Sequence, residues 1–275
     1  MLTITGCRSL NWHSSCLDDV TDQVVNGPLL TVIVPVYNEE AILAESITAL
    51  TEALEPLGLD YELLICENGS TDSTETLARA LMAEHPQIRL ESLSEASYGG
   101  ALRHGIAHAR GPLIVVFNID FWDVDFLRCA LELLKSCDLV VGSKAALGAQ
   151  DRRPFLRRMI TRSFTFLLRL LFGFQGTDTH GIKAFRADRV VPIVQACETD
   201  HEIFDTEIIL RAHQTGLHLC EIPVSVQEMR PSRYSLWQRV PATFRDLIWL
   251  IRVLGIRRPG GRSAPPSSFR ERNTV

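Results

Sequence analysis

Strand-like and helix-like segments alternate through the first half of this chain. Short apolar runs occur at 29–36, 61–67, 88–92, 113–118 and 138–142, and stretches with helical periodicity separate them. Strands that alternate with helices of this length pair in parallel through right-handed crossovers. A chain of 275 residues can form one large α/β domain or two small ones. We predict a single α/β domain with a mainly parallel sheet flanked by helices.

The pattern changes toward both ends of the chain. Residues 1–27 show no clear periodicity and are expected to be a loosely ordered leader, followed by the main domain at 28–235. Residues 236–256 read as an amphipathic helical extension. The last segment, 257–275, is rich in Pro, Gly, Ser and Arg, and we expect it to be disordered.

Composition excludes several classes of protein. The net charge of -5 argues against a nucleic-acid-binding protein, because phosphate binding needs surplus Lys and Arg. The 7 cysteines have no CxxC spacing, so we expect reduced thiols in the cytoplasm and neither a disulfide framework nor a zinc site. The 8 histidines are likewise not expected to bind zinc. No signal peptide and no apolar run of bilayer length is found, which predicts a protein that is soluble or lies on a membrane surface.

Polar residues follow the expected strands. The first strand runs into Tyr37-Asn38-Glu39 and not into a G-x-G-x-x-G loop, so no glycine-rich loop would hold a nucleotide's phosphates. Other polar groups follow at Asn68, Asn118-Ile119-Asp120 and Lys144. Carboxyl ends of parallel strands share one edge of the sheet, so these groups should converge. An aromatic ring, amide and carboxylate oxygens and a cation suit a nucleoside diphosphate.

Several motifs together resemble a known family. The stretches VPVYNEE, ENGSTDST, NID and DTHGIKAFRAD, in this order and spacing, are similar to family-2 glycosyltransferases of the GT-A fold. Within the family, the chain most resembles the dolichyl- or polyprenyl-phosphate sugar synthases. The resemblance implies a GDP- or UDP-sugar donor, a divalent metal (Mg²⁺ or Mn²⁺) that bridges its diphosphate, and often a lipid-phosphate acceptor.

The resemblance also assigns roles by position. The residues expected to contact the nucleotide sugar are Pro35, Tyr37, Glu39, Cys66, Asn68, Asn118, Ile119, Asp120 and Lys144. Asn118 and Asp120 occupy the ends of the family's Asp-x-Asp motif, so they are the expected metal ligands. Lys144 stands where the family usually has an Arg after Gly-Ser.

This chain departs from the family at the expected metal site. The family usually has Asp where this chain has Asn68 and Asn118, and Gln where it has Trp122. An amide oxygen is a weaker, neutral ligand for Mg²⁺ or Mn²⁺, so we expect a weakened site. Asp123 could restore a ligand if it shared a helical face with Asp120. Alternatively, Asn118 and Asp120 only cap the following helix.

A basic amphipathic segment at 152–172 suggests where an acceptor binds. Taken as a helix, it has a broad apolar face, with Arg158, Arg162 and Arg169 on the other side. By resemblance, Arg157 and Thr161 fall where the acceptor's phosphate is contacted. Such a helix suits a membrane surface, but an ordinary surface helix packed on the core has the same pattern.

Further downstream, the resemblance singles out two more groups. Asp205 and Glu207 stand where the family uses acidic residues to order the active site, although Asp205 could simply be a helix N-cap. Arg230 and Arg233 lie in a segment similar to the loop that closes over the phosphates, so they are expected to neutralise the leaving diphosphate. His180 is expected to have a local structural role.

The sequence thus predicts an inverting glycosyltransferase, peripheral on the inner face of the membrane, with Asp120, Asp205, Arg230 and Arg233 as catalytic residues. One alternative is a catalytically weakened or inactive relative that binds a sugar nucleotide without turnover. Another is a sugar-phosphate nucleotidyltransferase, although the glycine-rich signature of that class is missing. The sequence does not specify an oligomeric state.

Overall fold

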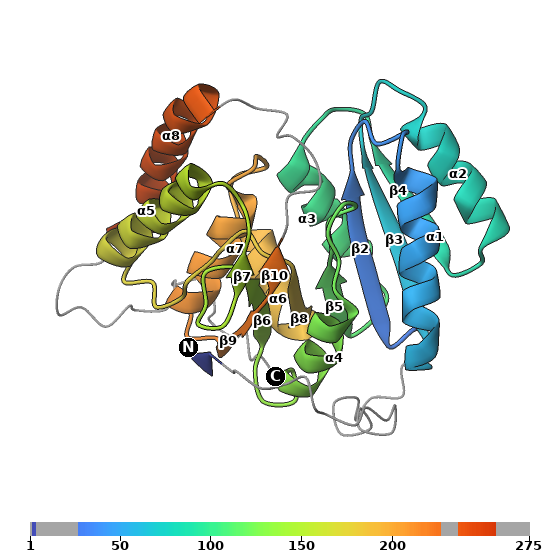
Figure 1. The fold of residues 1–275 in the computed structure, drawn as a ribbon, viewed down its shortest axis with the longest axis horizontal. Coiled ribbons are helices and arrows are strands. Elements are labelled where there is room, and N and C mark those ends of the chain that lie inside the picture. The colour runs from blue at the N-terminus through green and yellow to red at the C-terminus, as the bar shows by residue number, and fades with distance from the viewer. Residues whose placement is uncertain (1, 4–26, 227–235, 257–275) are drawn as a thin grey trace, which may run out of the picture.

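A computed structural model describes residues 2–3, 27–226 and 236–256 of the chain (Figure 1). Its central sheet has 8 strands in the order β1-β9-β6-β8-β5-β2-β3-β4. In that order, the strands are Leu2–Thr3, Leu219–Pro223, Leu139–Ser143, Lys183–Arg186, Leu113–Val116, Leu30–Val36, Tyr61–Asn68 and Ile88–Leu93. A separate two-stranded sheet pairs β7 (Gln150–Asp151) with β10 (Ser225–Val226).

Helices cover both faces of the central sheet. They are α1 (Leu43–Leu54), α2 (Thr74–Glu84), α3 (Tyr98–His108), α4 (Val124–Leu133), α5 (Phe155–Phe172), α6 (Ala187–Ala196), α7 (Phe204–Gln214) and α8 (Leu236–Leu254), with a short 3-10 turn at Glu55–Leu57. The helices α1, α2 and α4 pack on one face, and α3, α5, α6, α7 and α8 contribute to the core on the other. In Figure 1, α5 and α8 lie at the opposite end of the molecule from α2.

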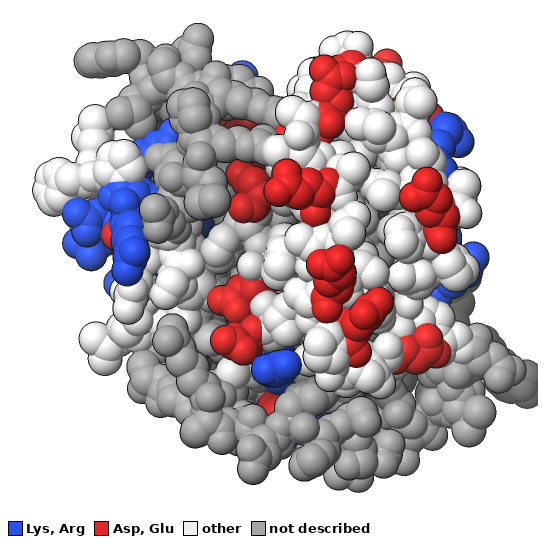
Figure 2. Space-filling view, turned by 45° about the vertical axis from the view of Figure 1, so that its right-hand side comes forward, with Lys and Arg blue, Asp and Glu red and all other residues white. Residues whose placement is uncertain are grey.

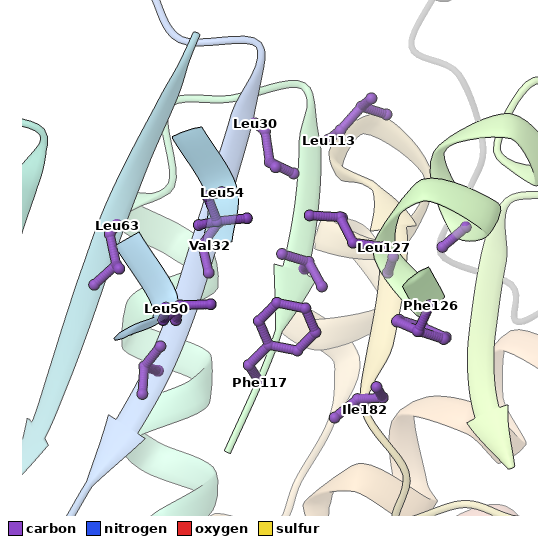
Figure 3. Close-up of a cluster of buried hydrophobic side chains, with 14 of the residues drawn as sticks. Leu30, Val32, Leu50, Leu54, Leu63, Leu113, Phe117, Phe126, Leu127 and Ile182 are labelled. Atoms are coloured by element: carbon purple, nitrogen blue, oxygen red, sulfur yellow. The ribbon is translucent and has the colours of Figure 1, made fainter. Parts of the chain in front are cut away.

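The central strands are apolar throughout because both of their faces are buried. In β2, Leu30 and Val32 point toward α1 and α4, whereas Ile33 points toward α3. Figure 3 shows the first of these cores, in which side chains from the strands meet Leu50 of α1 and Phe126 of α4. The prediction of one α/β domain with a mainly parallel sheet is confirmed.

One strand runs against the others. β8 is antiparallel to both of its neighbours, β5 and β6. Its register places Lys183 beside Val116 of β5 and Val141 of β6. The sequence did not predict this strand's direction, because its pairing depends on contacts far apart in the chain.

Both ends of the chain contribute to the described structure. Leu2 and Thr3, inside the expected leader, form β1 beside β9. The expected helices at 152–172 and 236–256 are present as α5 and α8. Residues 4–26 and the expected disordered tail at 257–275 lie outside the described residues. None of the helices in the described ranges is both long enough and apolar enough to cross a bilayer.

The expectation that every cysteine is a reduced thiol is wrong. Cys137 and Cys220 form a disulfide between Cα atoms 6.4 Å apart. They are 83 residues apart in the sequence and become neighbours because β6 and β9 pair, with Val140 opposite Cys220. Spacing rules could not find this pair, because only the sheet brings it together. The free cysteines among the described residues, Cys66, Cys129 and Cys197, are buried.

Candidate active site

The loops after β2, β3 and β5 meet at one edge of the sheet. β2 pairs in parallel with β3 on one side, where Val36 lies opposite Glu67, and with β5 on the other, where Ile33 lies opposite Val116. From β2 the chain continues to β3 and β4 in one direction, and then returns to β5 on the other side of β2. Parallel sheets bind ligands where the strand order reverses in this way. The ends of β2, β3 and β5 thus share one edge of the sheet, as predicted, while the convergence of the Tyr37, Asn68 and Asp120 side chains on one ligand stays a prediction.

The loops after β2 and β3 are bonded to each other. The backbone N–H of Asn38 donates to Ser70 Oγ over 2.9 Å, and Asn38 Oδ1 accepts from the Thr71 N–H over 2.8 Å. The Glu39 N–H donates to Thr74 Oγ1 over 2.8 Å. Asn38 has a φ of 52°, a conformation that Asn tolerates better than most residues. These bonds fix the backbone around the residues expected to bind the nucleotide.

The departure at Asn68 preserves a structural bond. Asn68 is buried, and its Oδ1 accepts from the backbone N–H of Ser97, the residue that caps α3, over 2.5 Å. Gly69 follows with a φ of 66°, and a Cβ there would lie 2.9 Å from the backbone of Glu95. An aspartate oxygen could accept the same bond, so the amide keeps the loop's shape while it removes one negative charge.

Cys66 lies behind this edge and not at it. Its side chain is 1% exposed and packs beneath α3, where a Cβ on Gly105 would come within 2.4 Å of its Sγ. Burial, with a smaller contribution from Glu91, raises the pKa of the thiol. The nucleotide contact expected of Cys66 stays a prediction, and its thiol is a core group in this structure.

The Asn118-Ile119-Asp120 turn presents one carboxylate to solvent. Asn118 and Phe121 exchange two backbone hydrogen bonds of 3.1 Å, which close the turn after β5. Ile119 is buried beneath it, and Asp120 is exposed at its tip. The turn thus holds a carboxylate and the Asn118 amide next to the point where the strand order reverses.

Asp123 has the capping role that the sequence left open for Asn118 and Asp120. Asp123 is the N-cap of α4, and its Oδ1 accepts from the Phe126 N–H over 3.0 Å. Asp120 lies outside the helix, so the two carboxylates share no helical face. Trp122 packs against the core. Asp120 with Asn118 remains the donor set at this turn, which fits a metal that is held mainly by diphosphate oxygens and water.

Lys144, after β6, is paired with an aspartate. Its Nζ lies 3.1 Å from Asp178 Oδ2, and both side chains are largely buried. Burial alone would raise the pKa of Asp178, but Lys144 and the backbone N–H of His180 outweigh it and lower the pKa. The loop containing Asp178 is held by Glu221, which accepts from the Thr177 N–H and hydroxyl over 2.6 and 2.7 Å. Lys144 is thus a cation in a rigid setting.

Asp205 belongs to a buried network and is not an N-cap. α7 has Ile203 at its N-cap position, and Asp205 lies inside the first turn. The Asp205 carboxylate is 3% exposed; its Oδ1 lies 3.0 Å from Lys183 Nζ, and its Oδ2 accepts from the Tyr98 hydroxyl over 3.0 Å. This network joins α3, β8 and α7 behind the strand ends. Its partners Lys183 and Tyr98 are protein groups, which favours a positioning role.

Sequence reasoning missed two members of this network, Lys183 and Tyr98. Lys183 lies in the quoted GIKAF stretch, where a lysine inside an apolar strand is a signal of a buried ion pair. Tyr98 is 107 residues from Asp205 in the sequence, and no local pattern relates them. Burial, then the negative charge of Asp205, raises the pKa of Tyr98 well above its usual value, so it stays a hydroxyl donor.

Glu207 and His180 have structural contacts. The Glu207 carboxylate is fully buried, lies 2.7 Å from Arg211 and accepts from the backbone N–H groups of Glu198 and Thr199. His180 contacts the Thr179 hydroxyl over 3.0 Å and the Phe164 ring. Burial lowers the pKa of His180, although the negative charge of Asp205 opposes this effect.

The residues expected to bind the acceptor lie on α5. Thr161 lies 3.5 Å from Arg153, which forms a 2.7 Å ion pair with Asp151 of β7. One turn further along α5, the Thr165 hydroxyl lies 3.0 Å from the carbonyl of Thr161 and 3.3 Å from that of Thr177, so α5 contacts the loop that precedes Asp178. Arg157 lies in the first turn of the helix. Arg230 and Arg233 fall outside the described residues.

Comparisons with known proteins agree with this architecture. The model of the family described as glycosyl transferase family 2 matches residues 31–191. Glycosyltransferase AglD of Haloferax volcanii is 31% identical over 72% of this chain, which spans only 33% of that protein. The dolichyl-phosphate beta-glucosyltransferase of Saccharomyces cerevisiae is 30% identical over 83% of this chain and 76% of its own length.

Solved structures show the same fold. Glucosyl-3-phosphoglycerate synthase from Mycobacterium tuberculosis, in complex with Mn²⁺, UDP and phosphoglyceric acid, has a TM-score of 0.67 at 19% identity, over 94% of this chain and 88% of that one. The mannosyltransferase PcManGT from Pyrobaculum calidifontis, in complex with GDP-Man and Mn²⁺, has a TM-score of 0.55 at 22% identity, over 82% of this chain and 65% of that one.

Proposed function

Because this chain belongs to glycosyl transferase family 2, we propose that it transfers a sugar from a nucleoside diphosphate donor to a polyprenyl phosphate. The observation that carries the proposal is the meeting of the loops after β2, β3 and β5, with the exposed carboxylate of Asp120, where the strand order reverses. The acceptor class rests on similarity to dolichyl-phosphate beta-glucosyltransferases, which extends over more than four fifths of this chain.

The proposed reaction is a single in-line displacement. An oxygen of the acceptor's phosphate attacks the anomeric carbon, the bond to the donor's diphosphate breaks, and the configuration at that carbon inverts. A phosphate is already ionised near neutral pH, so no general base is required. The work of the protein is to position the two substrates and to stabilise the departing diphosphate.

We propose that two cations at the strand ends offset the negative charge of the donor's diphosphate. A bound Mg²⁺ or Mn²⁺, held by Asp120 and the Asn118 amide, would offset the diphosphate's negative charge. The M. tuberculosis and P. calidifontis structures contain Mn²⁺ with UDP and GDP-Man, respectively. They support a divalent metal but do not distinguish uracil from guanine as the nucleobase of the donor. Lys144 supplies a second cation if the donor's phosphates replace Asp178 as its partner.

We propose that α5 and α8 place the enzyme on a membrane surface. Phe155, Met159, Phe166 and Leu170 of α5 are exposed, and their spacing puts them in one stripe that also includes the exposed Arg162. The opposite side of α5 packs on the core through Leu168 and Phe172. An apolar stripe that includes an arginine suits the boundary between headgroups and acyl chains.

α8 repeats this arrangement in its described half. Phe244, Ile248 and Trp249 are exposed, while Leu247 and Leu250 are buried in the core. α5 and α8 contribute to the same core through Leu168 and Leu250, and Figure 1 draws both at the same end of the molecule. On the face drawn in Figure 2, basic side chains lie at the left and right edges, and acidic ones are spread over much of the area between them. We propose the cytoplasmic face for the enzyme because a membrane presents anionic lipids there, whereas the Cys137–Cys220 disulfide is more typical of an oxidising compartment.

Incubation with labelled nucleotide sugars tests the proposal. The purified protein, Mn²⁺ and vesicles that contain a polyprenyl phosphate are combined with UDP- and GDP-sugars in turn, and label is followed into extracted lipid. The expected result is transfer from one donor class that depends on the lipid phosphate. Tight donor binding with neither transfer nor hydrolysis would instead support the non-catalytic alternative.

A further inference from the structure

A cluster of metal-ligating side chains lies between β4 and α3, away from Asp120. His104 and His108 are one helical turn apart on α3, and Glu91 faces them from β4. The sequence H-G-I-A-H at 104–108 has the H-x-x-x-H spacing that places two imidazoles on one face of a helix. The expectation that the histidines do not bind zinc did not take this spacing into account.

The ligand atoms are already close together. One ligand atom of each residue lies within 4.8 Å of the other two. Nε2 of His104 and Oε2 of Glu91 are 2.9 Å apart, and the two imidazole rings have centroids 4.0 Å apart. Two ligands on a tetrahedral zinc ion are separated by roughly 3.3 Å, given bonds of about 2.0 Å. A small rotation of the exposed His108 side chain would complete such a set.

Neighbouring groups orient both ends of the cluster. Nδ1 of His108 lies 2.8 Å from the carbonyl of His104. A carbonyl can only accept, so Nδ1 carries the proton and Nε2 keeps the lone pair that a metal needs. When His104 binds through Nε2, its single proton moves to Nδ1, and the imidazole stays neutral.

A neighbouring side chain also orients the Glu91 carboxylate. Arg89 lies 3.1 Å from Oε1 of Glu91, which leaves Oε2 directed at His104. Arg89 is itself neutralised by the buried Glu62 at 2.8 Å. The exposed Arg110 also lies 4.0 Å from Glu62, so with two neutral imidazoles the charges of these two acids and two arginines balance, and the attraction for a cation comes from the ligand atoms themselves.

We propose that Glu91, His104 and His108 form a binding site for a divalent transition-metal ion of the Zn²⁺ type. Two imidazoles and one carboxylate are a known ligand set for zinc. The site is separate from Asp120, because β4 and β5 are three strands apart in the sheet, or roughly 14 Å at a strand spacing of about 4.8 Å. A bound ion would fasten the C-terminal half of α3 to the edge strand, on the helix whose start holds Asn68 and Asp205.

Zinc binding to protein without an affinity tag tests this site directly. Titration of Zn²⁺ against a competing chromophoric chelator is compared between the wild type, His104→Asn, His108→Asn and the control His218→Asn, an exposed histidine outside the cluster. Since loss of an outer partner already costs about 10–100-fold in metal affinity, loss of a direct ligand should cost ~100-fold or more. We expect this loss in the first two variants and an unchanged affinity in the control.

Two further measurements keep the test independent of catalysis and of folding defects. Zn²⁺ should raise the Tm of the wild type and of His218→Asn but not of His108→Asn, and Co²⁺ should give the visible absorption of a nitrogen-containing tetrahedral site in the wild type. Equal affinities in all four proteins, or a wild type with no Tm shift in excess Zn²⁺, would overturn the proposal. Neither result depends on a sugar donor, so the proposed glycosyl transfer would be untouched.

Discussion

At the scale of single residues, Asp205 and Asp120 are carboxylates in opposite settings. Asp205 is buried between Lys183 and Tyr98, whereas Asp120 is exposed at the tip of a turn. A buried carboxylate with an ion-pair partner on one oxygen and a hydrogen-bond donor on the other holds neighbouring elements in place. An exposed one at the strand ends is available to a ligand. The two residues should therefore respond differently to substitution.

Asp205→Asn should destabilise the protein strongly, because it leaves Lys183 as a buried charge without a counterion. Breaking such a pair typically costs about 3–5 kcal/mol, measured here as the free energy of unfolding in urea. Asp188→Asn, which removes an exposed pair with Arg186, is the control and should cost less than about 1 kcal/mol. Adding Lys183→Met to Asp205→Asn should recover part of the lost stability. Equal costs for Asp205→Asn and Asp188→Asn would refute the argument.

Asn118→Asp should strengthen the metal site, because it replaces a neutral amide oxygen by an anionic one. We expect the concentration of Mn²⁺ that half-activates transfer to fall about tenfold, which corresponds to ~1.4 kcal/mol. The measurement is the rate of transfer as a function of Mn²⁺ at saturating donor. An unchanged or higher requirement would show that Asn118 is not near the ion.

At the scale of elements, α3 connects most of the features described above. Its start binds Asn68 and Asp205 through Ser97 and Tyr98, and its middle packs so closely on β3 that Gly105 touches Cys66. Close contact of this kind requires a residue without a side chain. The position of the helix therefore depends on one glycine as well as on apolar burial.

Gly105→Ala tests this contact, since the new Cβ would lie 2.4 Å from Cys66 Sγ. Overpacking should cost about 1–3 kcal/mol in the free energy of unfolding, partly offset by the better helix propensity of Ala. In a Cys66→Ala background, the same substitution should cost much less or become stabilising. A cost that is the same in both backgrounds would mean that the sulfur is not the obstacle.

The apolar stripe on α5 makes a prediction about membrane binding. Phe155→Glu combined with Phe166→Glu should weaken partitioning onto anionic vesicles by more than tenfold, because each buried Phe contributes about 1.5–3 kcal/mol. Co-sedimentation with vesicles measures this effect. Met82→Glu, at a less exposed apolar residue on α2 at the far end of the molecule, should leave partitioning unaltered. Equal binding by all three proteins would contradict a membrane role for α5.

At the scale of the whole molecule, the sequence predicted what depends on local pattern. Apolar runs and helical periodicity identified β2, β3 and β5 and the sheet edge that their ends share. It did not predict the antiparallel β8, the Cys137–Cys220 pair or the Tyr98–Asp205 bond. These features join segments far apart in the chain, and a single sequence carries no local signal of such pairings.

The transfer rate of Asp120→Ala is the measurement that tests the central claim most directly. The control is Asp125→Ala, an exposed aspartate in the first turn of α4 that is outside the proposed site. Loss of a charge that stabilises a leaving group should lower the rate about 100-fold or more, while the control keeps the wild-type rate. If Asp120→Ala transferred sugar as fast as the wild type, the donor's diphosphate would not be bound at this edge of the sheet.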